Sequence, residues 1–342
     1  MKYYKIDVMS KSIRPIIIRE QVIKSVREFF TKKEFHEVVI PVFNSSLPLE
    51  QNIYSFKTTW VNLKGKKVFY LTTSPEAYLK KMIAKGIGNC FAIGHSFRNM
   101  ESAGKIHNPE FLMLEWYRQD AAYEYIMREV KELILFCQKV ILASESVSAS
   151  RIRRGSWTSQ DDVLLHEWPV ISLEYLFKKY ARLNLADIID DKRLTKAAKE
   201  KGYKIEDKTW EQIFNQIFLN EIEPHLSPKE PFFLIDYPAK ISPLCAKRKD
   251  KPYLAQRFEL YIAGIEIGNG NTENTDYKSV HKVFKVESEK RKKVGELSPP
   301  IDMEFIRALK KMQGKSYAGI GLGVDRLAMM LGGIKNIKQL LG

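Results

Sequence analysis

Two glutamates in an apolar segment are the first residues whose types and spacing could support chemistry. Glu259 and Glu266 stand in the segment FELYIAGIEIGNG, whose other residues are mostly apolar or glycine. A buried carboxylate is costly unless it is paired or bound to a metal. Mg²⁺ takes oxygen ligands and accepts the phosphate oxygens of a substrate as the rest of its shell. The pair therefore predicts a Mg²⁺ site beside a nucleotide; the alternative is that both residues face water at a sheet edge.

Two arginines stand where they could hold phosphate groups. Arg98 ends the apolar run 90–97, and a planar guanidinium at that position can be aimed at a phosphate. Phe111 begins the next apolar run and could offer a flat face to a base. Arg326 follows GIGLG, whose glycines let a strand pass close to a ligand; the G-x-G-x-G spacing does not match the dinucleotide motif. The alternatives are a structural loop around Arg98 and plain strand-to-helix packing before Arg326.

A second group of acidic residues predicts a site for a positively charged substrate. Glu115 and Tyr117 would share one face of a strand, because side chains alternate along it. Glu76 stands near a helix start, where the helix dipole favours a negative charge. Several carboxylates in one cleft would select a cationic group. The alternative is a set of ordinary surface acids.

The elements that must position these residues can be read from the apolar spacing. Long helices are expected at 13–34 and 122–147, and a helical, polar segment at 172–230 could be an inserted subdomain. The apolar runs 90–97 and 111–117 predict an antiparallel hairpin with a long polar loop. The other expected strands are 35–41, 68–72, 232–235, 258–263, 265–268 and 318–322; the other expected helices are 76–84, 277–293, 302–312 and one from 325. A surface loop is expected at 155–167.

Composition narrows the classes of function. The chain has 342 residues, with 56 Lys and Arg against 41 Asp and Glu, for a net charge of +15. This surplus favours an acidic partner such as nucleic acid, a nucleotide or an acidic protein, although lysines that merely solvate helices would give the same total. Cys90, Cys137 and Cys245 form no C-x-x-C pair, so no zinc site is expected. No stretch approaches the ~18 apolar residues of a membrane span, and no secretory signal is visible. We therefore expect a cytoplasmic protein without membrane contact.

Taken together, these segments resemble the three signature motifs of class II aminoacyl-tRNA synthetases. The helix and strand that end at Pro41 are similar to motif 1, the hairpin of Arg98 to motif 2, and the segment from Gly321 to Arg326 to motif 3. The strings FRN…HNPEF.MLEWY and GLGVDRL resemble the lysine branch of the family. The resemblance extends over nearly the whole chain, from about Ile13 to Gly333.

The resemblance implies a fold and a reaction. The fold is the α+β catalytic domain of class II aminoacyl-tRNA synthetases, an antiparallel six- or seven-stranded sheet flanked by helices, which dimerises through motif 1. In the reaction, the carboxylate of an amino acid attacks the α-phosphate of ATP, pyrophosphate leaves, and an aminoacyl-adenylate forms without a covalent enzyme intermediate. Such catalysis rests on positioning and charge neutralisation. The implied cofactors are ATP and Mg²⁺.

The resemblance also assigns the residues that would bind ATP. Arg98 would hold the α-phosphate and Arg326 the γ-phosphate of bent ATP, so both are the expected catalytic residues. Phe111 and Arg326 would enclose adenine from its two faces. The implied ATP-binding set is Arg98, Asn99, Glu101, His107, Phe111, Glu259 and Arg326, and the implied Mg²⁺ ligands are Glu259 and Glu266.

A further set is implied for the amino acid. Glu76 and Asn269 match positions near the α-amino and carboxylate groups of lysine. Glu115, Tyr117 and Glu273 match positions around its side-chain ammonium, and Gly321 belongs to the wall of the pocket.

The sequence departs from the family's pattern at several of these positions. The loop from Arg98 to His107 is one residue longer, and Met100 stands where a glutamate is expected, so Glu101 would contact the adenine amino group instead. Asn271 replaces an aromatic residue that lines the lysine chain. Gly268 and Gly321 stand where ligases of β-lysine have alanine and where tRNA-charging enzymes have glycine. The choice between α-lysine, β-lysine and a related diamino acid therefore stays open.

The layout implies one function and leaves two alternatives. The segment similar to motif 1 begins near residue 13, so we expect one catalytic domain over 1–342, with the helical insertion at about 172–230 and no anticodon-binding domain. This resembles the ligases that activate lysine or (R)-β-lysine and transfer it to a lysine side chain of elongation factor P, an acidic acceptor that would suit the positive charge. One alternative is a freestanding lysine activator that charges tRNA or another acceptor. The other is a non-catalytic, tRNA-binding regulatory paralogue, in which loss of motif residues such as Arg98 would be expected.

Overall fold

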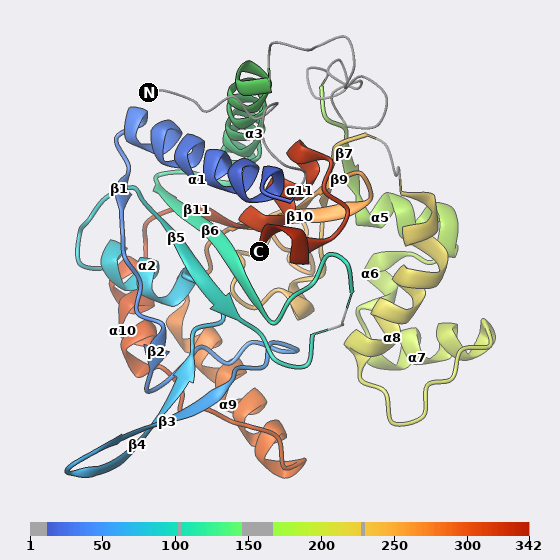
Figure 1. The fold of residues 1–342 in the computed structure, drawn as a ribbon. Coiled ribbons are helices and arrows are strands. Elements are labelled where there is room, and N and C mark those ends of the chain that lie inside the picture. Colours follow the sequence, from blue (N-terminus) through green and yellow to red (C-terminus); the bar gives the residue numbers. More distant parts are fainter. Residues whose placement is uncertain (1–11, 102–103, 146–166, 227–229, 342) are drawn as a thin grey trace.

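A large mixed sheet forms the centre of the protein (Figure 1). The computed structural model describes residues 12–101, 104–145, 167–226 and 230–341; most of the loop expected at 155–167 lies outside them. Eight strands of the described residues lie in the order β1-β5-β6-β11-β10-β9-β8-β7. Their bounds are β1 His36–Glu37, β5 Cys90–Phe97, β6 Glu110–Gln119, β11 Tyr317–Gly323, β10 Ile265–Thr272, β9 Arg257–Ile262, β8 Phe232–Ile235 and β7 Val170–Ser172.

The strand pairing corrects the prediction of an antiparallel sheet with six or seven strands. The inner pairs are antiparallel, but β1 pairs with β5, and β7 with β8, in parallel. These two edge strands have 2 and 3 residues, which is too short for an alternating pattern to show in the sequence. The strand expected at 35–41 is accordingly reduced to His36–Glu37.

Three helices cover one face of the sheet: α1 Arg14–Lys32, α3 Tyr123–Glu145 and α11 Val324–Gly332 (Figure 1). α1 starts with Pro15 in its first turn, where a missing N–H costs no hydrogen bond. Its apolar residues recur every three or four positions and are buried against the sheet and the other two helices. The main hydrophobic core therefore lies between these helices and the inner strands.

The opposite face is covered by α2 Glu76–Ile83, α9 Tyr277–Lys293 and α10 Met303–Met312 (Figure 1). Asp276 and Asp302 precede α9 and α10 and accept hydrogen bonds from the first backbone N–H groups of each helix. Phe284 and Phe305 stack between these two helices with their ring centroids 6.1 Å apart. The helices expected at 76–84, 277–293 and 302–312 are thus confirmed.

A small second sheet extends away from the body as a hairpin (Figure 1). It consists of β2 Phe43–Asn44, β4 Gly65–Leu71 and β3 Lys57–Asn62. Only β4 was expected, as 68–72; β3 mixes apolar and polar residues on both faces, because neither face is buried in this chain.

Helices also fill most of the segment between β7 and β8. They are α5 Leu173–Leu176, η3 Phe177–Ala181, α6 Leu185–Ile188, α7 Asp191–Glu200, α8 Trp210–Ile217, η4 Phe218–Ile222 and η5 Glu223–His225. This agrees with the expected helical character, but the segment is less polar than expected: it buries its own hydrophobic cluster against β8, with Phe177 and Phe214 stacked at 4.7 Å. No helix among the described residues is long and apolar enough to cross a membrane.

Candidate active site

A cavity of about 440 Å³ lies over the inner strands of the large sheet. Residues of β6, β10 and β11 line it, together with residues from the start of α2, the β5–β6 loop and the segment 241–245. Most of the residues implicated by the sequence line this one cavity: Glu76, Arg98, Glu101, His107, Phe111, Glu115, Tyr117, Glu266, Asn269, Gly321 and Arg326. Asn99, Glu259 and Glu273 do not line it.

Antiparallel pairing brings four of the implicated residues into one row across the sheet. Glu115 of β6 lies opposite Gly321 of β11, Gly321 opposite Asn269 of β10, and Asn269 opposite Glu259 of β9. Residues that lie opposite one another on antiparallel strands point to the same face. Segments that are far apart in the sequence therefore present their functional groups side by side.

A β-bulge in β10 puts Glu266 on the same face as this row. Glu266 pairs with Tyr261 of β9, and the register then shifts so that Asn269, rather than Gly268, lies opposite Glu259. Because side chains alternate along a strand, residues 266 and 269 would otherwise point to opposite faces. The extra residue of the bulge restores them to one face, and both line the cavity.

Two glycines of β11 shape the cavity wall in different ways. A Cβ atom at Gly319 would lie 2.4 Å from a ring carbon of Tyr117, so that only glycine fits beside this tyrosine. A Cβ atom at Gly321 would meet Met113 Sδ at 3.6 Å and Glu115 at 3.9 Å, which are ordinary contacts. The wall at Gly321 therefore has room for a methyl group.

Two guanidinium groups form the positive end of the cavity. Arg98 lies over the Phe111 ring, 5.4 Å from its centroid, and its Nε donates to the Thr73 carbonyl at 3.3 Å. Arg326, in the first turn of α11, donates through Nη1 to the Glu266 carbonyl at 2.8 Å. Two arginines held in this way could neutralise a polyphosphate. The cation over the Phe111 ring in this structure is Arg98, and Arg326 lies at the cavity wall.

The β5–β6 loop supplies Glu101 and His107 to the same end. Burial, and then the nearby Arg326, lower the pKa of the His107 imidazole, which favours its neutral form. Asn99 is exposed, and its side chain accepts a hydrogen bond from Met100 N at 2.9 Å. Asn99 therefore shapes the loop in this structure and does not face the cavity. Met100 is 72% exposed, and Glu101 is the acidic residue that reaches the cavity.

The two carboxylates expected to bind Mg²⁺ differ in their surroundings. Glu266 lines the cavity, and burial followed by repulsion from Glu259 raises its pKa. Glu259 is buried and accepts hydrogen bonds from Tyr237 at 2.5 Å, Tyr261 at 2.9 Å and Arg257 at 2.7 Å. Neighbouring carboxylates that repel one another fit a divalent cation. Within the described residues no three His, Cys, Asp or Glu side chains form a metal site, so the remaining ligands would have to be phosphate or water oxygens.

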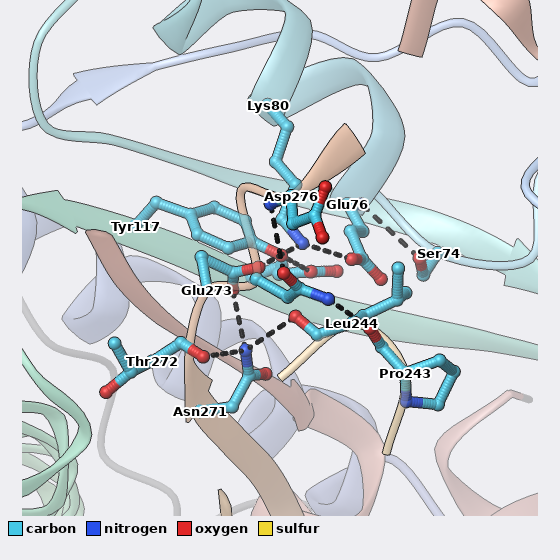
Figure 2. Close-up of polar contacts among 12 residues, drawn as sticks. Ser74, Glu76, Lys80, Tyr117, Pro243, Leu244, Asn271, Thr272, Glu273 and Asp276 are labelled. Atoms are coloured by element: carbon cyan, nitrogen blue, oxygen red, sulfur yellow. Dashed lines mark hydrogen bonds and ion pairs between the residues drawn. The ribbon is translucent and has the colours of Figure 1, made fainter. Parts of the chain in front are cut away.

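The other end of the cavity is acidic (Figure 2). The Tyr117 hydroxyl donates to Glu115 Oε1, while Glu115 Oε2 is buried and accepts no hydrogen bond from any residue that the structure describes. Burial, and then repulsion from Glu76, raise the pKa of the Glu115 carboxyl well above its usual value. A carboxylate oxygen left without a partner in a buried site fits a cationic group brought by a ligand.

Lys80 is a central residue of this end that the sequence analysis missed. Its side chain is 1% exposed, and its ammonium pairs with both Glu76 and Glu273 (Figure 2). Burial alone would lower the pKa of this ammonium, but the two carboxylates raise it overall. The available signal was the spacing of Glu76 and Lys80 by four residues on one helix. Glu273 is therefore occupied by a cation of the protein and does not line the cavity.

Asn271 holds Glu273 in place. Its Nδ2 donates to Glu273 Oε1 at 3.0 Å and to the Thr272 carbonyl at 3.1 Å, as Figure 2 shows. Burial raises the pKa of Glu273 to about 7, against the effect of Lys80. Asn271 also lines the cavity, so it connects the buried ion pair to the space where a ligand would lie.

Comparison with known proteins identifies the family. The family model described as "tRNA synthetases class II (D, K and N)" matches residues 1–341. The chain belongs to this family. Three relatives named elongation factor P–(R)-beta-lysine ligase come from Photobacterium profundum, Photorhabdus laumondii and Buchnera aphidicola. They are 33%, 31% and 29% identical to it, over 96%, 97% and 98% of this chain and 94%, 95% and 97% of their own lengths.

Membership of the class II synthetase family gives the cavity a chemical meaning. The chain is a ligase that uses ATP. The two arginines and the acidic end lie in one cavity, as a class II synthetase needs to bring a nucleotide phosphate and an amino acid together.

Besides Lys80, the sequence analysis missed Asp325. Its carboxylate accepts from Leu112 N at 2.7 Å and from Arg19 at 2.6 Å, which ties α11 to β6 and α1.

Proposed function

We propose that this protein activates lysine or β-lysine as an aminoacyl-adenylate and transfers it to a lysine side chain of elongation factor P. The observation that carries the proposal is the two-ended cavity. Arginines stand at one end, and at the other lies a buried carboxylate oxygen, Glu115 Oε2, that has no partner among the described residues. A diamino acid would place its carboxylate toward the arginines and its distant ammonium at Glu115.

Activation would proceed through the residues of the cavity. Arg98 would hold the α-phosphate as the amino-acid carboxylate attacks it, and Arg326 the terminal phosphate of the leaving pyrophosphate. Phe111 and His107 would contact adenine, with Glu101 at its amino group. Mg²⁺, if bound at Glu259 and Glu266, would neutralise phosphate charge. Donors already aimed at the phosphate require little reorganisation as charge develops.

The amino acid would be held by the acidic end. Glu76 and Asn269 would contact its amino and carboxylate groups, and Tyr117 would orient Glu115 toward the side-chain ammonium. Glu273 would act through Lys80 and Asn271 rather than by direct contact, because it does not line the cavity.

The choice of acceptor rests on the relatives and on charge. The three relatives described above are named for elongation factor P. The net charge of +15 would favour an acidic acceptor. One observation favours tRNA charging as a second candidate: Gly321 leaves room for the methyl group that the β-lysine ligases carry there.

We also propose how the chain is organised. Residues 1–342 would form one catalytic domain with a helical insertion at about 172–230, and two copies would form a homodimer through the region of α1 and β1.

An acceptor assay tests the proposed function. The purified protein, ATP, Mg²⁺ and labelled lysine or (R)-β-lysine are offered elongation factor P and bulk tRNA in separate reactions. We expect ATP–pyrophosphate exchange that depends on Mg²⁺, and label on elongation factor P. Label on tRNA alone would favour tRNA charging as the function. The absence of exchange with every cationic amino acid would overturn the proposal that the enzyme activates lysine or β-lysine.

A further inference from the structure

Glu50 is a carboxylate of the cavity to which the proposed activation step gives no role. It lies between β2 and β3, is half-buried, and lines the cavity together with Glu76 and Arg98. Among the described residues, no group donates a hydrogen bond to its carboxylate or forms an ion pair with it. The carboxylates of the acidic end each have a protein partner, as described above. Glu50 is thus free to act on a ligand.

The backbone at Glu50 is firmly held, so its side chain has a defined position. Arg291 of α9 donates through Nη2 to the Glu50 carbonyl at 2.5 Å and to the Ile53 carbonyl at 3.1 Å. Arg291 is itself 2% exposed and pairs with Glu287 at 2.7 Å. Leu49, directly before Glu50, is 1% exposed. The segment is anchored on both sides of the free carboxylate.

Charged groups from three elements act on the Glu50 carboxylate. They are Glu76 and Lys80 of α2, Arg98 after β5 and Arg257 of β9. Burial, and then repulsion from Glu76, raise the pKa of Glu50 to about 7, while the three cations oppose the rise. A carboxylate that exchanges its proton near neutral pH is suited to act as a base.

We propose that Glu50 accepts a proton from the acceptor amine in the second half-reaction, an inference that rests on the proposed function. A lysine side chain arrives mainly as an ammonium, which has no lone pair and must lose one proton before it can attack. Glu50 takes that proton. The neutral nitrogen then bonds to the carbonyl carbon of the adenylate, the carbon–oxygen bond to phosphate breaks, and AMP leaves with the electron pair. The phosphate of AMP takes the second proton of the nitrogen.

Two features favour a base over a further binding group for the amino acid. Glu50 lines the same cavity as Arg98, the residue proposed to hold the α-phosphate, and it therefore shares the space in which the adenylate would lie. The cations Arg98, Lys80 and Arg257 disfavour a second positive charge nearby, and so they ease deprotonation of the acceptor ammonium.

The test separates proton removal from the rest of the reaction. Wild type and Glu50→Gln are loaded with labelled adenylate and mixed with either elongation factor P or hydroxylamine, whose nitrogen is unprotonated at neutral pH and needs no base. Transfer to elongation factor P should fall about 100-fold in the variant, whereas transfer to hydroxylamine should fall by less than about tenfold. The wild-type rate should rise through about pH 7 as Glu50 ionises, and this inflection should be absent in Glu50→Gln and retained in Glu50→Asp.

Glu211→Gln is the matched control. Glu211 lies beside the same segment, where its Oε1 accepts from Asn52 Nδ2 at 2.8 Å, and it does not line the cavity. Its ratio of transfer to exchange should equal that of wild type. Equal transfer to elongation factor P by Glu50→Gln and wild type would overturn the inference. The inference would also be overturned if Glu50→Gln lost transfer to elongation factor P and to hydroxylamine equally. The same holds if the main defect of this variant were a raised KM for lysine in ATP–pyrophosphate exchange. A wild type that shows no exchange, or that labels tRNA instead, would overturn the proposed function and the inference together.

Discussion

Arg98 and Gly321 show how much a single residue is expected to decide in this cavity. Arg98 is held against Phe111 and the Thr73 carbonyl, so its guanidinium is oriented before a ligand binds. Gly321 lies at the opposite wall, beside Glu115. The first residue should determine whether activation occurs, and the second which amino acid is activated.

Substitution of Arg98 should slow activation strongly. Arg98→Ala removes a charged donor from the α-phosphate and should lower the rate of ATP–pyrophosphate exchange by about 10²–10³-fold, the usual loss for one donor aimed at a developing charge. Arg98→Lys keeps the charge but loses the planar fork, so it should recover only part of the rate. Exchange by Arg98→Ala at the wild-type rate would remove this residue from the proposed mechanism.

Substitution of Gly321 should change selectivity. Gly321→Ala places a methyl group at ordinary contact distance from Met113 and Glu115, and should shift the exchange rate toward (R)-β-lysine over α-lysine by about tenfold at most. Gly268→Ala is the contrasting variant, because its Cβ would lie 3.0 Å from the Gly321 carbonyl and should lower stability instead. A wild type already strict for (R)-β-lysine would show that Gly321 does not set the choice.

For single residues, the sequence predicted which residue types line the cavity but not which groups they pair with. Arg98, Glu115 and Arg326 stand in recognisable strings, and each lines the cavity. The pairing of Lys80 with Glu273 depends on α2 packing against the end of β10, and no spacing in the sequence shows it. The role of Glu50 could not be predicted either, because its place in the cavity depends on a contact with Arg291 of α9.

Among the elements, the peripheral helix α9 is connected to the cavity through its residue Arg291. Arg291 reaches from α9 to the segment that carries Glu50, and it pairs with Glu287 of its own helix. Its guanidinium carbon lies 4.9 Å from the centroid of the Tyr54 ring. Both charged residues are almost fully buried. A buried pair of this kind is costly to break by removing one member.

Removal of Arg291 should therefore destabilise the protein. Arg291→Met leaves the Glu287 carboxylate buried without its partner and should lower the free energy of unfolding by about 3–5 kcal/mol, measured by urea denaturation. The double variant Arg291→Met, Glu287→Leu removes both charges and should recover part of that loss. A double variant less stable than Arg291→Met would show that the salt bridge is not the reason.

Long elements were predictable and short ones were not. The regular apolar spacing of α1, and the two runs that became β5 and β6, gave elements close to the observed bounds. β1 and β7 are too short to carry a pattern, and β3 lacks a buried face. The mixed character of the sheet arises from those two short edge strands.

Several exposed apolar side chains lie on or next to β1, β2 and β3. Val39 is 87% exposed, Phe43 59%, Trp60 55% and Val61 63%. A monomer rarely leaves such a group uncovered. We therefore expect the proposed homodimer to cover some of these residues.

Light scattering on the purified protein should give the mass of a dimer. Val39→Glu, beside β1, places a charge in the proposed interface and should shift the protein to monomers at micromolar concentration, and Trp60→Glu should do the same if the interface extends to β3. Tyr175→Glu is the control, because Tyr175 is 54% exposed on the helical segment; it should leave the dimer intact. A monomeric wild type would contradict the proposal.

The bulge in β10 marks the one point where this strand can lose a residue. A deletion of Ile267 would remove only the extra residue of the bulge, so Asn269 would still lie opposite Glu259 and on the same face as Glu266. A deletion between Asn269 and Asn271, where the pairing is regular, would instead turn these two side chains to opposite faces. In an alignment of proteins that use these residues, a gap of one residue is therefore acceptable at the bulge and suspect on physical grounds in the regular part of the strand.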